Sequence, residues 1–316
     1  MGIVFGPVPS RRLGVSLGVN NIPVKICTYS CVYCQIGRTI KMIGERKAFY
    51  EPFQIRTEVS NVLRKLSKEN IHVDYISFVP DGEPTLDKNL GKEIELLRDF
   101  EIPIAVLTNS SLMSCEDVRN DLFEADLVSL KIDAVTEEIW KKVDRPLGTL
   151  DLGEILEGIK TFTRNFKGKV ITETMLINSI DYKEEAEKIA RFIAHLNVNE
   201  VYVAIPTRPP AEKWVKPPPE EVINYVYQKF AAHIGESKVK LLTAFEGTSF
   251  YPPGSIENAL LEITSVHPMR EDAVKELLEK RGVDWSLVEK MLKQGELIEI
   301  EYLGRKYYMR KLPTRR

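Results

Sequence analysis

Three of the four cysteines in this 316-residue chain fall in one short segment, and their spacing suits an iron–sulfur cluster. Cys27, Cys31 and Cys34 follow the pattern C-x3-C-x2-C. Thiolates of cysteine hold [4Fe-4S] clusters, and full protein ligation needs four of them. The three thiolates therefore predict a [4Fe-4S] cluster in which one iron is left for an outside ligand.

Two simpler interpretations of these cysteines are weaker. A structural zinc site needs a fourth Cys or His at matching spacing, and none lies near the motif. A disulfide is disfavoured because the motif holds an odd number of cysteines and the remaining one, Cys115, lies far away in the sequence. We expect Cys115 to be a free, buried thiol.

A repeated strand-then-helix rhythm follows the motif and would supply the scaffold. Alternation of this kind favours a parallel sheet with helices outside it, and such sheets place their sites at the carboxyl ends of the strands. The predicted strands are 73–80, 104–108, 127–132, 170–177 and 201–205, and the predicted helices are 88–100, 115–124, 152–165 and 183–196.

Polar residues gather where three of these strands end. The segment 81–86 reads D-G-E-P-T-L, which is either an ordinary turn or a site where Gly82 permits close backbone approach and Glu83 receives an ammonium group. The segment 108–111 could bind a cofactor or cap the next segment. Strand alternation places Lys131 and Asp133 on one face, as cavity residues or as a structural ion pair.

The cysteine motif, with Tyr33 directly before its last cysteine, resembles the radical S-adenosylmethionine (SAM) superfamily. The resemblance implies an oxidoreductase in which SAM chelates the open iron and is cleaved reductively to a 5′-deoxyadenosyl radical. It also implies that D-G-E-P corresponds to the family's G-G-E-P element, with Asp81 in place of the first glycine. The cofactor contacts implied in this way are Gly82 and Glu83 for the methionine end, Tyr33 for the adenine, and Asn109, Lys131 and Asp133 for the carboxylate and ribose.

Asp133 followed by Asp144-Arg145-Pro146 further resembles the wyosine-synthase-like branch of that superfamily. This branch implies transfer RNA, or another RNA, as substrate. Its archaeal members hold a second cluster with additional amino-terminal cysteines, and this chain has no cysteine before Cys27. The departure argues against the same reaction.

Three arginines are candidates for substrate binding. Arg11 and Arg12 are adjacent and close in sequence to the cysteine motif, and Arg208 follows the predicted strand 201–205. Guanidinium forks suit phosphate or carboxylate. A solvated pair or an ion pair within the fold explains Arg11 and Arg12 equally well. Glu173 also lies in a predicted strand, but its face could not be assigned.

The rhythm changes after about residue 240. We expect a radical SAM domain over 1–240, a linker over 241–254 that includes Tyr251-Pro252-Pro253-Gly254, and a winged-helix-like module over 255–316. The module's expected elements are helices over 273–280 and 285–293 and a hairpin of strands 297–302 and 306–310. The predicted fold class is thus α/β, a partial (β/α)6 TIM-like barrel followed by a winged-helix-like module. Such modules bind nucleic acid or pack against protein.

Composition agrees with a cytoplasmic enzyme. The net charge of −2 is not the basic balance of a dedicated nucleic-acid binder. No long apolar run or signal-type start is present, which predicts no membrane association. The resemblance also implies an electron donor such as ferredoxin or flavodoxin.

Three classes of function stay open at this point. The first is a radical enzyme that modifies RNA, and the second is a radical enzyme that acts on a peptide, protein or small metabolite. The third is an iron–sulfur sensor or DNA-binding regulator without turnover. The polar residues at the strand ends argue for an enzyme, because a sensor would not need a cofactor-binding set. The sequence singles out no catalytic residue beyond the cofactor contacts.

Overall fold

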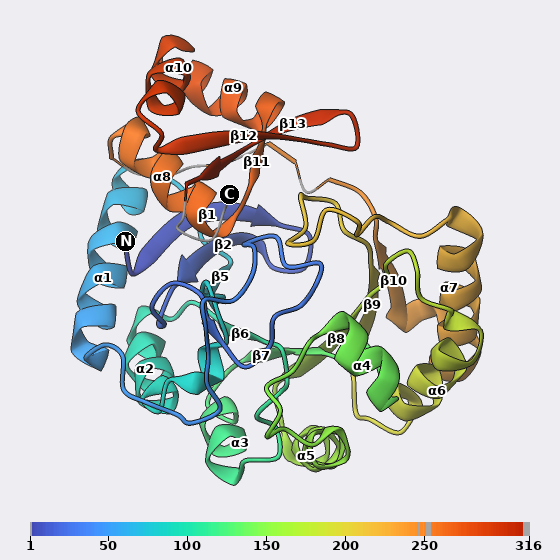
Figure 1. Ribbon diagram of the computed structural model, residues 1–316. Coiled ribbons are helices and arrows are strands. Elements are labelled where there is room, and N and C mark those ends of the chain that lie inside the picture. The colour runs from blue at the N-terminus through green and yellow to red at the C-terminus, as the bar shows by residue number, and fades with distance from the viewer. Residues whose placement is uncertain (1, 246, 249, 251–253, 312–316) are drawn as a thin grey trace.

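The computed structural model describes residues 2–245, 247–248, 250 and 254–311, and a curved eight-stranded sheet forms its centre (Figure 1). All neighbouring strands pair in parallel except the first two, which form an antiparallel hairpin. In sheet order, the strands are β1 (Val4–Ser10), β2 (Gly14–Val19), β5 (Tyr75–Phe78), β6 (Ile104–Thr108), β7 (Leu127–Lys131), β8 (Lys169–Met175), β9 (Glu200–Ala204) and β10 (Val239–Leu242).

Helices cover the outside of this sheet, and the blue segment that follows β2 crosses its open end (Figure 1). Their amphipathic sequences bury one face against the strands, as in α5, where Ile155, Ile159 and Phe162 are buried and the Asp151 side chain caps the first turn. The helices are α1 (Pro52–Lys68), α2 (Leu90–Leu97), α3 (Glu116–Leu122), α4 (Glu137–Val143), α5 (Leu152–Asn165), α6 (Tyr182–Ala194) and α7 (Glu220–Ile234).

The predicted α/β fold class is confirmed, with several differences in detail. The sheet starts with the antiparallel hairpin of β1 and β2, and it continues through β10, which ends inside the predicted linker 241–254. Helix α1 was not predicted. Residues 251–253 of the proposed linker lie outside the described residues. Among the described residues, no helix is long and apolar enough to cross a bilayer.

The chain after β10 forms a smaller, separately cored unit. Its elements are α8 (Ile256–Val266), β11 (Met269–Arg270), α9 (Glu271–Lys280), α10 (Ser286–Lys293), β12 (Leu297–Tyr302) and β13 (Arg305–Arg310). The three strands are antiparallel in the order β11-β13-β12. The two predicted helices and the hairpin are present, and α8 and β11 precede them. Figure 1 shows this unit above β1 and β2, and α8 packs against β1.

A buried carboxyl pair fixes the segment that follows β5. Asp87 directly follows the short 3-10 helix Pro84–Leu86, and it hydrogen-bonds Glu93 of α2. Both side chains are fully buried. Burial, with Asp87 as the next contribution, raises the pKa of Glu93 to about 9. The two carboxyl groups therefore share a proton at neutral pH.

This pair predicts a loss of stability at high pH. The pKa of Glu93 is higher in the folded state than in the unfolded state. Its contribution to stability is therefore fully present below the unfolded pKa, near 4.5, and is lost as pH rises through about 9. Thermal melts between pH 5 and pH 9 (roughly the range over which the pair titrates) should show a falling Tm for the wild type. Glu93→Gln should flatten that fall, whereas Glu95→Gln, on the exposed face of α2, should leave it unchanged. Equal slopes in all three proteins would contradict the shared proton.

Candidate active site

The three motif cysteines lie in the loop between β2 and α1. Cys27 ends the short strand β3 (Ile26–Cys27), which pairs in parallel with β4 (Lys41–Met42). The amide of Cys34 donates to the carbonyl of Cys31 over 3.1 Å, so the chain turns tightly between these two cysteines. All three cysteines line one cavity of about 370 Å³. Among the described residues, no three Cys, His, Asp or Glu side chains are grouped as ligands of a single metal ion.

The D-R-P segment supports the cysteine loop from behind. The loop amides of Ser30 and Val32 donate to the carbonyls of Asp144 and Val143 over 3.0 and 2.9 Å, and the amide of Leu147 donates to the carbonyl of Thr28 over 2.9 Å. These bonds hold the backbone of the cysteine loop against the segment 143–147. The D-R-P element, which the sequence linked to the site by resemblance alone, thus positions the cysteine loop.

A carboxylate clamp ties the same loop to the segment after β9. Glu212 accepts both Nε and Nη2 of Arg38, at 3.0 and 2.9 Å. It also pairs with Arg145 over 2.5 Å. The Glu212 side chain is nearly buried, and a bidentate Arg–carboxylate pair has a fixed geometry. Glu212 therefore joins three segments that are distant in sequence.

Gly82 and Glu83 lie directly against the cysteine loop. A Cβ at Gly82 would lie 1.8 Å from the carbonyl oxygen of Ile26, so the close backbone approach predicted for this glycine is made to the loop. The Glu83 carboxylate accepts from the amide and hydroxyl of Thr85, from the hydroxyl of Thr108 and from the amide of Asn109. Glu83 lines the cavity, and Oε2 has a single bond among these four.

Asn109 connects the end of β6 to the first cysteine. Its Nδ2 donates to Thr28 Oγ1 over 2.9 Å and reaches Cys27 Sγ at 3.5 Å. Its Oδ1 accepts from the amide of Ser111 over 2.9 Å. Segment 108–111 therefore turns the chain and contacts the cysteine loop, and cofactor binding by this segment stays a prediction.

Lys131 and Asp133 belong to a charged network at the end of β7. Lys131 Nζ lies 2.6 Å from Glu173 Oε1, 3.9 Å from Asp133 Oδ1 and 4.8 Å from the centre of the Tyr33 ring. Glu173 also forms an ion pair with Arg12. Arg12 and Lys131 therefore both face the carboxylate of Glu173. The ion pair expected between Lys131 and Asp133 is one contact of this larger charged network.

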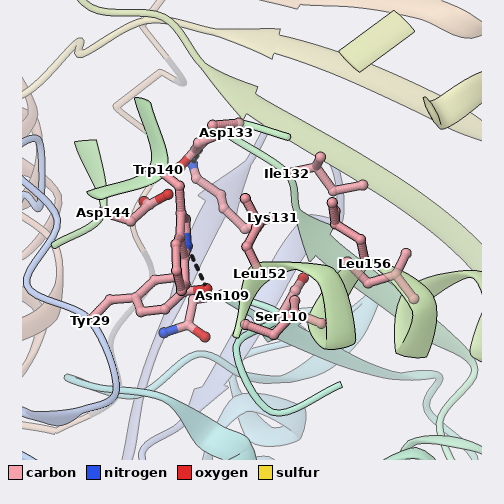
Figure 2. Close-up of a pocket in the computed structure, with 13 residues that line it drawn as sticks. Tyr29, Asn109, Ser110, Lys131, Ile132, Asp133, Trp140, Asp144, Leu152 and Leu156 are labelled. Carbon is pink, nitrogen blue, oxygen red and sulfur yellow. Dashed lines mark hydrogen bonds and ion pairs between the residues drawn. The ribbon is translucent and has the colours of Figure 1, made fainter. Parts of the chain in front are cut away.

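Behind Lys131, two buried carboxyl groups meet the Tyr33 hydroxyl. Tyr33 donates to Asp133 and lies 3.3 Å from Asp144 Oδ1. Figure 2 shows Lys131 extending toward Asp133, with Asp144 and Trp140 on the far side of a small cavity. Trp140 donates to the Tyr29 hydroxyl over 3.0 Å, which braces the wall behind the loop (Figure 2).

Burial and charge set the protonation of these groups. Burial raises the pKa of Cys27 to about 12, and Glu83 adds to the effect. A coordinating metal deprotonates such a thiol outright. Burial alone would raise the pKa of Glu173, but Arg12 and Lys131 lower it to about 2. Burial would lower the pKa of Lys131, and Asp133 and Glu173 together raise it instead.

The three candidate substrate arginines all line the same cavity. Arg12 pairs with Glu173, Arg11 donates to the carbonyl of Ala244, and Arg208 donates to the side chain of Gln35 in the cysteine loop. They lie in the segments after β1 and β9. The cavity thus brings five of the six predicted cofactor residues together with the predicted substrate arginines, whereas Asp133 lines a smaller cavity that it shares with Lys131.

The carboxyl-terminal unit forms one wall of the cavity. Val266 and His267, at the end of α8, line it together with the cysteines. Gln35 Nε2 donates to the carbonyl of Val266 over 3.2 Å. The hydroxyls of Tyr302 and Tyr307 donate to the carbonyls of Pro206 and Thr207 over 3.0 and 2.9 Å. The hairpin is therefore held against the segment after β9.

Sequence reasoning missed several residues of this site. Glu173 shares a register position with Lys131 in the parallel pair β7–β8, and knowledge of that register would have placed it on the same face. Glu212 gave no signal in the sequence, because its contacts with Arg38 and Arg145 join distant segments. Lys25 gave none either, because its contacts with Cys34 and Gly37 depend on how the loop folds. Cys115, at the start of α3, is a half-buried free thiol, away from the cavity-lining residues.

Comparison with known proteins agrees with this geometry. The family model of the radical SAM superfamily matches residues 21–193, which contain the three cysteines, the D-G-E-P element and Lys131. The chain belongs to the radical SAM superfamily. Because it belongs to this superfamily, the protein is a radical SAM enzyme. Its cofactors are a [4Fe-4S] cluster and SAM.

Similar proteins match the whole chain or about two thirds of it. A UPF0026 protein of Methanocaldococcus jannaschii is 52% identical over 316 residues, which cover 100% of this chain and 98% of that protein. A UPF0026 protein of Synechocystis sp. is 34% identical over 209 residues, covering 65% and 76%. A solved radical SAM methyltransferase from Sphaerobacter thermophilus superposes with a TM-score of 0.57 at 16% identity, covering 72% and 67%, which supports the fold alone. The wyosine-synthase-like branch is not confirmed by these likenesses.

Proposed function

We propose that Cys27, Cys31 and Cys34 hold the [4Fe-4S] cluster and that SAM binds beside it in the 370 Å³ cavity. The observation that carries this proposal is that the three thiols line the same cavity as Glu83, Asn109 and Lys131. When bound, the reduced cluster supplies the electron that cleaves SAM to a 5′-deoxyadenosyl radical. The cavity is in the size range of small-molecule and cofactor sites.

The donor and acceptor capacity of the lining residues fits the methionine end of SAM. Oε2 of Glu83 accepts one hydrogen bond of 2.7 Å, from the backbone amide of Asn109, and a carboxylate oxygen has lone pairs for a second donor such as an ammonium group. Lys131 has three N–H donors and gives one to Glu173. It therefore keeps donors for a carboxylate. We assign the amino group to Gly82 and Glu83 and the carboxylate to Lys131.

The remaining cofactor residues take supporting parts in this proposal. Tyr33, which lies in the cysteine loop itself, is fixed by Asp133 through its hydroxyl and carries Lys131 over its ring, so its ring is held in place for the adenine. Asp133 is fixed in turn by the amide of Met175 over 2.6 Å. Asn109, already bonded to Thr28, orients the loop toward the ribose.

RNA is the substrate class that we favour, on the resemblance to the wyosine-synthase-like branch. The element order of residues 256–310 supports the winged-helix-like interpretation, and its hairpin tip is exposed at Leu303, with Arg305 and Lys306 exposed beside it. Cationic side chains on an exposed hairpin suit contact with phosphates. A peptide or a small metabolite is the alternative, since the same unit also closes the cavity through Val266 and His267.

The test is 5′-deoxyadenosine formation by anaerobically reconstituted, dithionite-reduced protein supplied with SAM. We expect 5′-deoxyadenosine to form. We also expect bulk transfer RNA from the source organism to increase its formation severalfold, because a bound substrate organises the active site. Formation that is indifferent to RNA would move the substrate to the alternative class. A fully loaded protein that forms none would contradict the proposed function and favour the sensor.

A further inference from the structure

A buried lysine lies against the cluster ligands, and neither the sequence motif nor the SAM contacts account for it. Lys25 is 2% exposed. Its Nζ lies 3.5 Å from Cys34 Sγ and 2.5 Å from the carbonyl oxygen of Gly37. The side chain therefore turns inward, under the loop that carries the cysteines.

The backbone of Lys25 is fixed from two sides. Its amide donates to the carbonyl of Asp81 over 3.1 Å, and its carbonyl accepts the amides of Ile40 and Lys41 over 3.0 and 3.2 Å. Its φ of 59° is in the left-handed region, which favours glycine. A lysine at this position has backbone strain that a glycine would avoid. Such strain often occurs at functional sites, so a role for the Lys25 side chain is expected.

The charge of Lys25 has no carboxylate counterpart among the described residues. No ion pair within that part of the chain includes Lys25, and its two contacts are a thiol and a neutral carbonyl. A buried ammonium is costly unless an anion compensates it. Three thiolates make a bound cluster anionic, and reduction adds a further negative charge. The reduced cluster is the anion that best matches this cation.

We propose that Lys25 is a positioning residue that stabilises the reduced cluster by donating to the Cys34 thiolate. Hydrogen bonds to the sulfurs and the local net charge are what set the potential of iron–sulfur clusters. Asn109 donates to Cys27 in a similar way, but it carries no charge. Lys25 thus makes the one-electron reduction by an external donor more favourable. The inference rests on the proposed function, because it requires a cluster at Cys34.

The measurement is the midpoint potential of the cluster, from a redox titration followed by the EPR signal of the reduced form. Lys25→Met keeps an unbranched side chain of similar length and removes the charge and the donor. At a fixed potential we expect the ratio of reduced to oxidised cluster to fall about tenfold, a shift of about 59 mV toward more negative values for one electron. Lys25→Gln, which keeps an N–H donor, should shift the midpoint in the same direction by less.

The matched control is Lys41→Met, since Lys41 is exposed and lies in β4 beside the same loop. It makes the same change in net charge and should leave the midpoint unchanged. An unchanged midpoint in a fully loaded Lys25→Met protein would overturn the inference. Failure of both Lys25 variants to take up iron would also overturn it, because Lys25 would then be needed for assembly. Failure of the wild type to take up iron would instead contradict the proposed function.

Discussion

Cys31→Ala is expected to lose the cluster and, with it, 5′-deoxyadenosine formation. Cys31 lies in the middle of the motif and lines the cavity. The amide of the next residue, Val32, donates to the carbonyl of Val143, directly before the D-R-P segment. The loss of activity should exceed the roughly 10–100-fold that removal of an outer-shell partner costs at a metal site. The measurement is iron and sulfide content after anaerobic reconstitution, followed by product formation with SAM.

Cys115→Ala is the matched control for this variant. Cys115 is a half-buried free thiol outside the cavity-lining residues, so its loss should leave iron, sulfide and product unchanged. A Cys31→Ala protein that kept a full cluster and cleaved SAM would contradict the assignment of the ligands. So would equal losses in the two variants.

Gly82→Ala should displace the cysteine loop although it adds only one methyl group. The added Cβ would lie 1.8 Å from the backbone oxygen of Ile26, and a backbone atom one residue from Cys27 cannot yield as a flexible side chain does. Overpacking of this kind costs about 1–3 kcal/mol. We expect a lower Tm and a cluster occupancy reduced by about tenfold or more.

Gly148→Ala controls for the loss of a glycine. An added Cβ there would meet nothing within 4 Å, and its backbone is not in the left-handed region. Its Tm and iron content should match the wild type. If Gly82→Ala also matched the wild type, the close approach of D-G-E-P to the cysteine loop would not be needed for the site.

Local patterns in the sequence were enough for the parts of the site that depend on neighbouring residues. The strand Ile104–Thr108 and the helix Leu152–Asn165 were predicted at their observed bounds, and the cysteine spacing stands in the sequence itself. Lys131 and Asp133 were placed on one face by strand alternation alone. In each case the signal lies within a few residues of the chain.

Contacts that depend on how distant segments meet could not be predicted in this way. Glu173 needed the register between β7 and β8, and the Arg145–Glu212 pair needed the path of the chain after β9. The inward turn of Lys25 needed its left-handed backbone. Helix α8 did carry a signal, because Ser255 caps it, but that signal falls just after the proline-rich segment interpreted as a linker.

The carboxyl-terminal unit shows the same contrast between local and distant information. Its hairpin was predicted at nearly its observed bounds, but its position was not. Tyr302 and Tyr307 are ordinary strand residues in the sequence, and the structure places their hydroxyls on the carbonyls of Pro206 and Thr207. The unit therefore contributes to the cavity whether or not it also binds RNA.

We expect SAM to bind directly to a cluster held by only three cysteines. The most direct test of this binding is the EPR spectrum of the dithionite-reduced, fully loaded protein, recorded without and with SAM. A ligand on the open iron changes the electronic environment of the cluster, so we predict a clear change in the signal when SAM is added. A spectrum that is identical with and without SAM, in protein with full iron and sulfide content, would contradict the account.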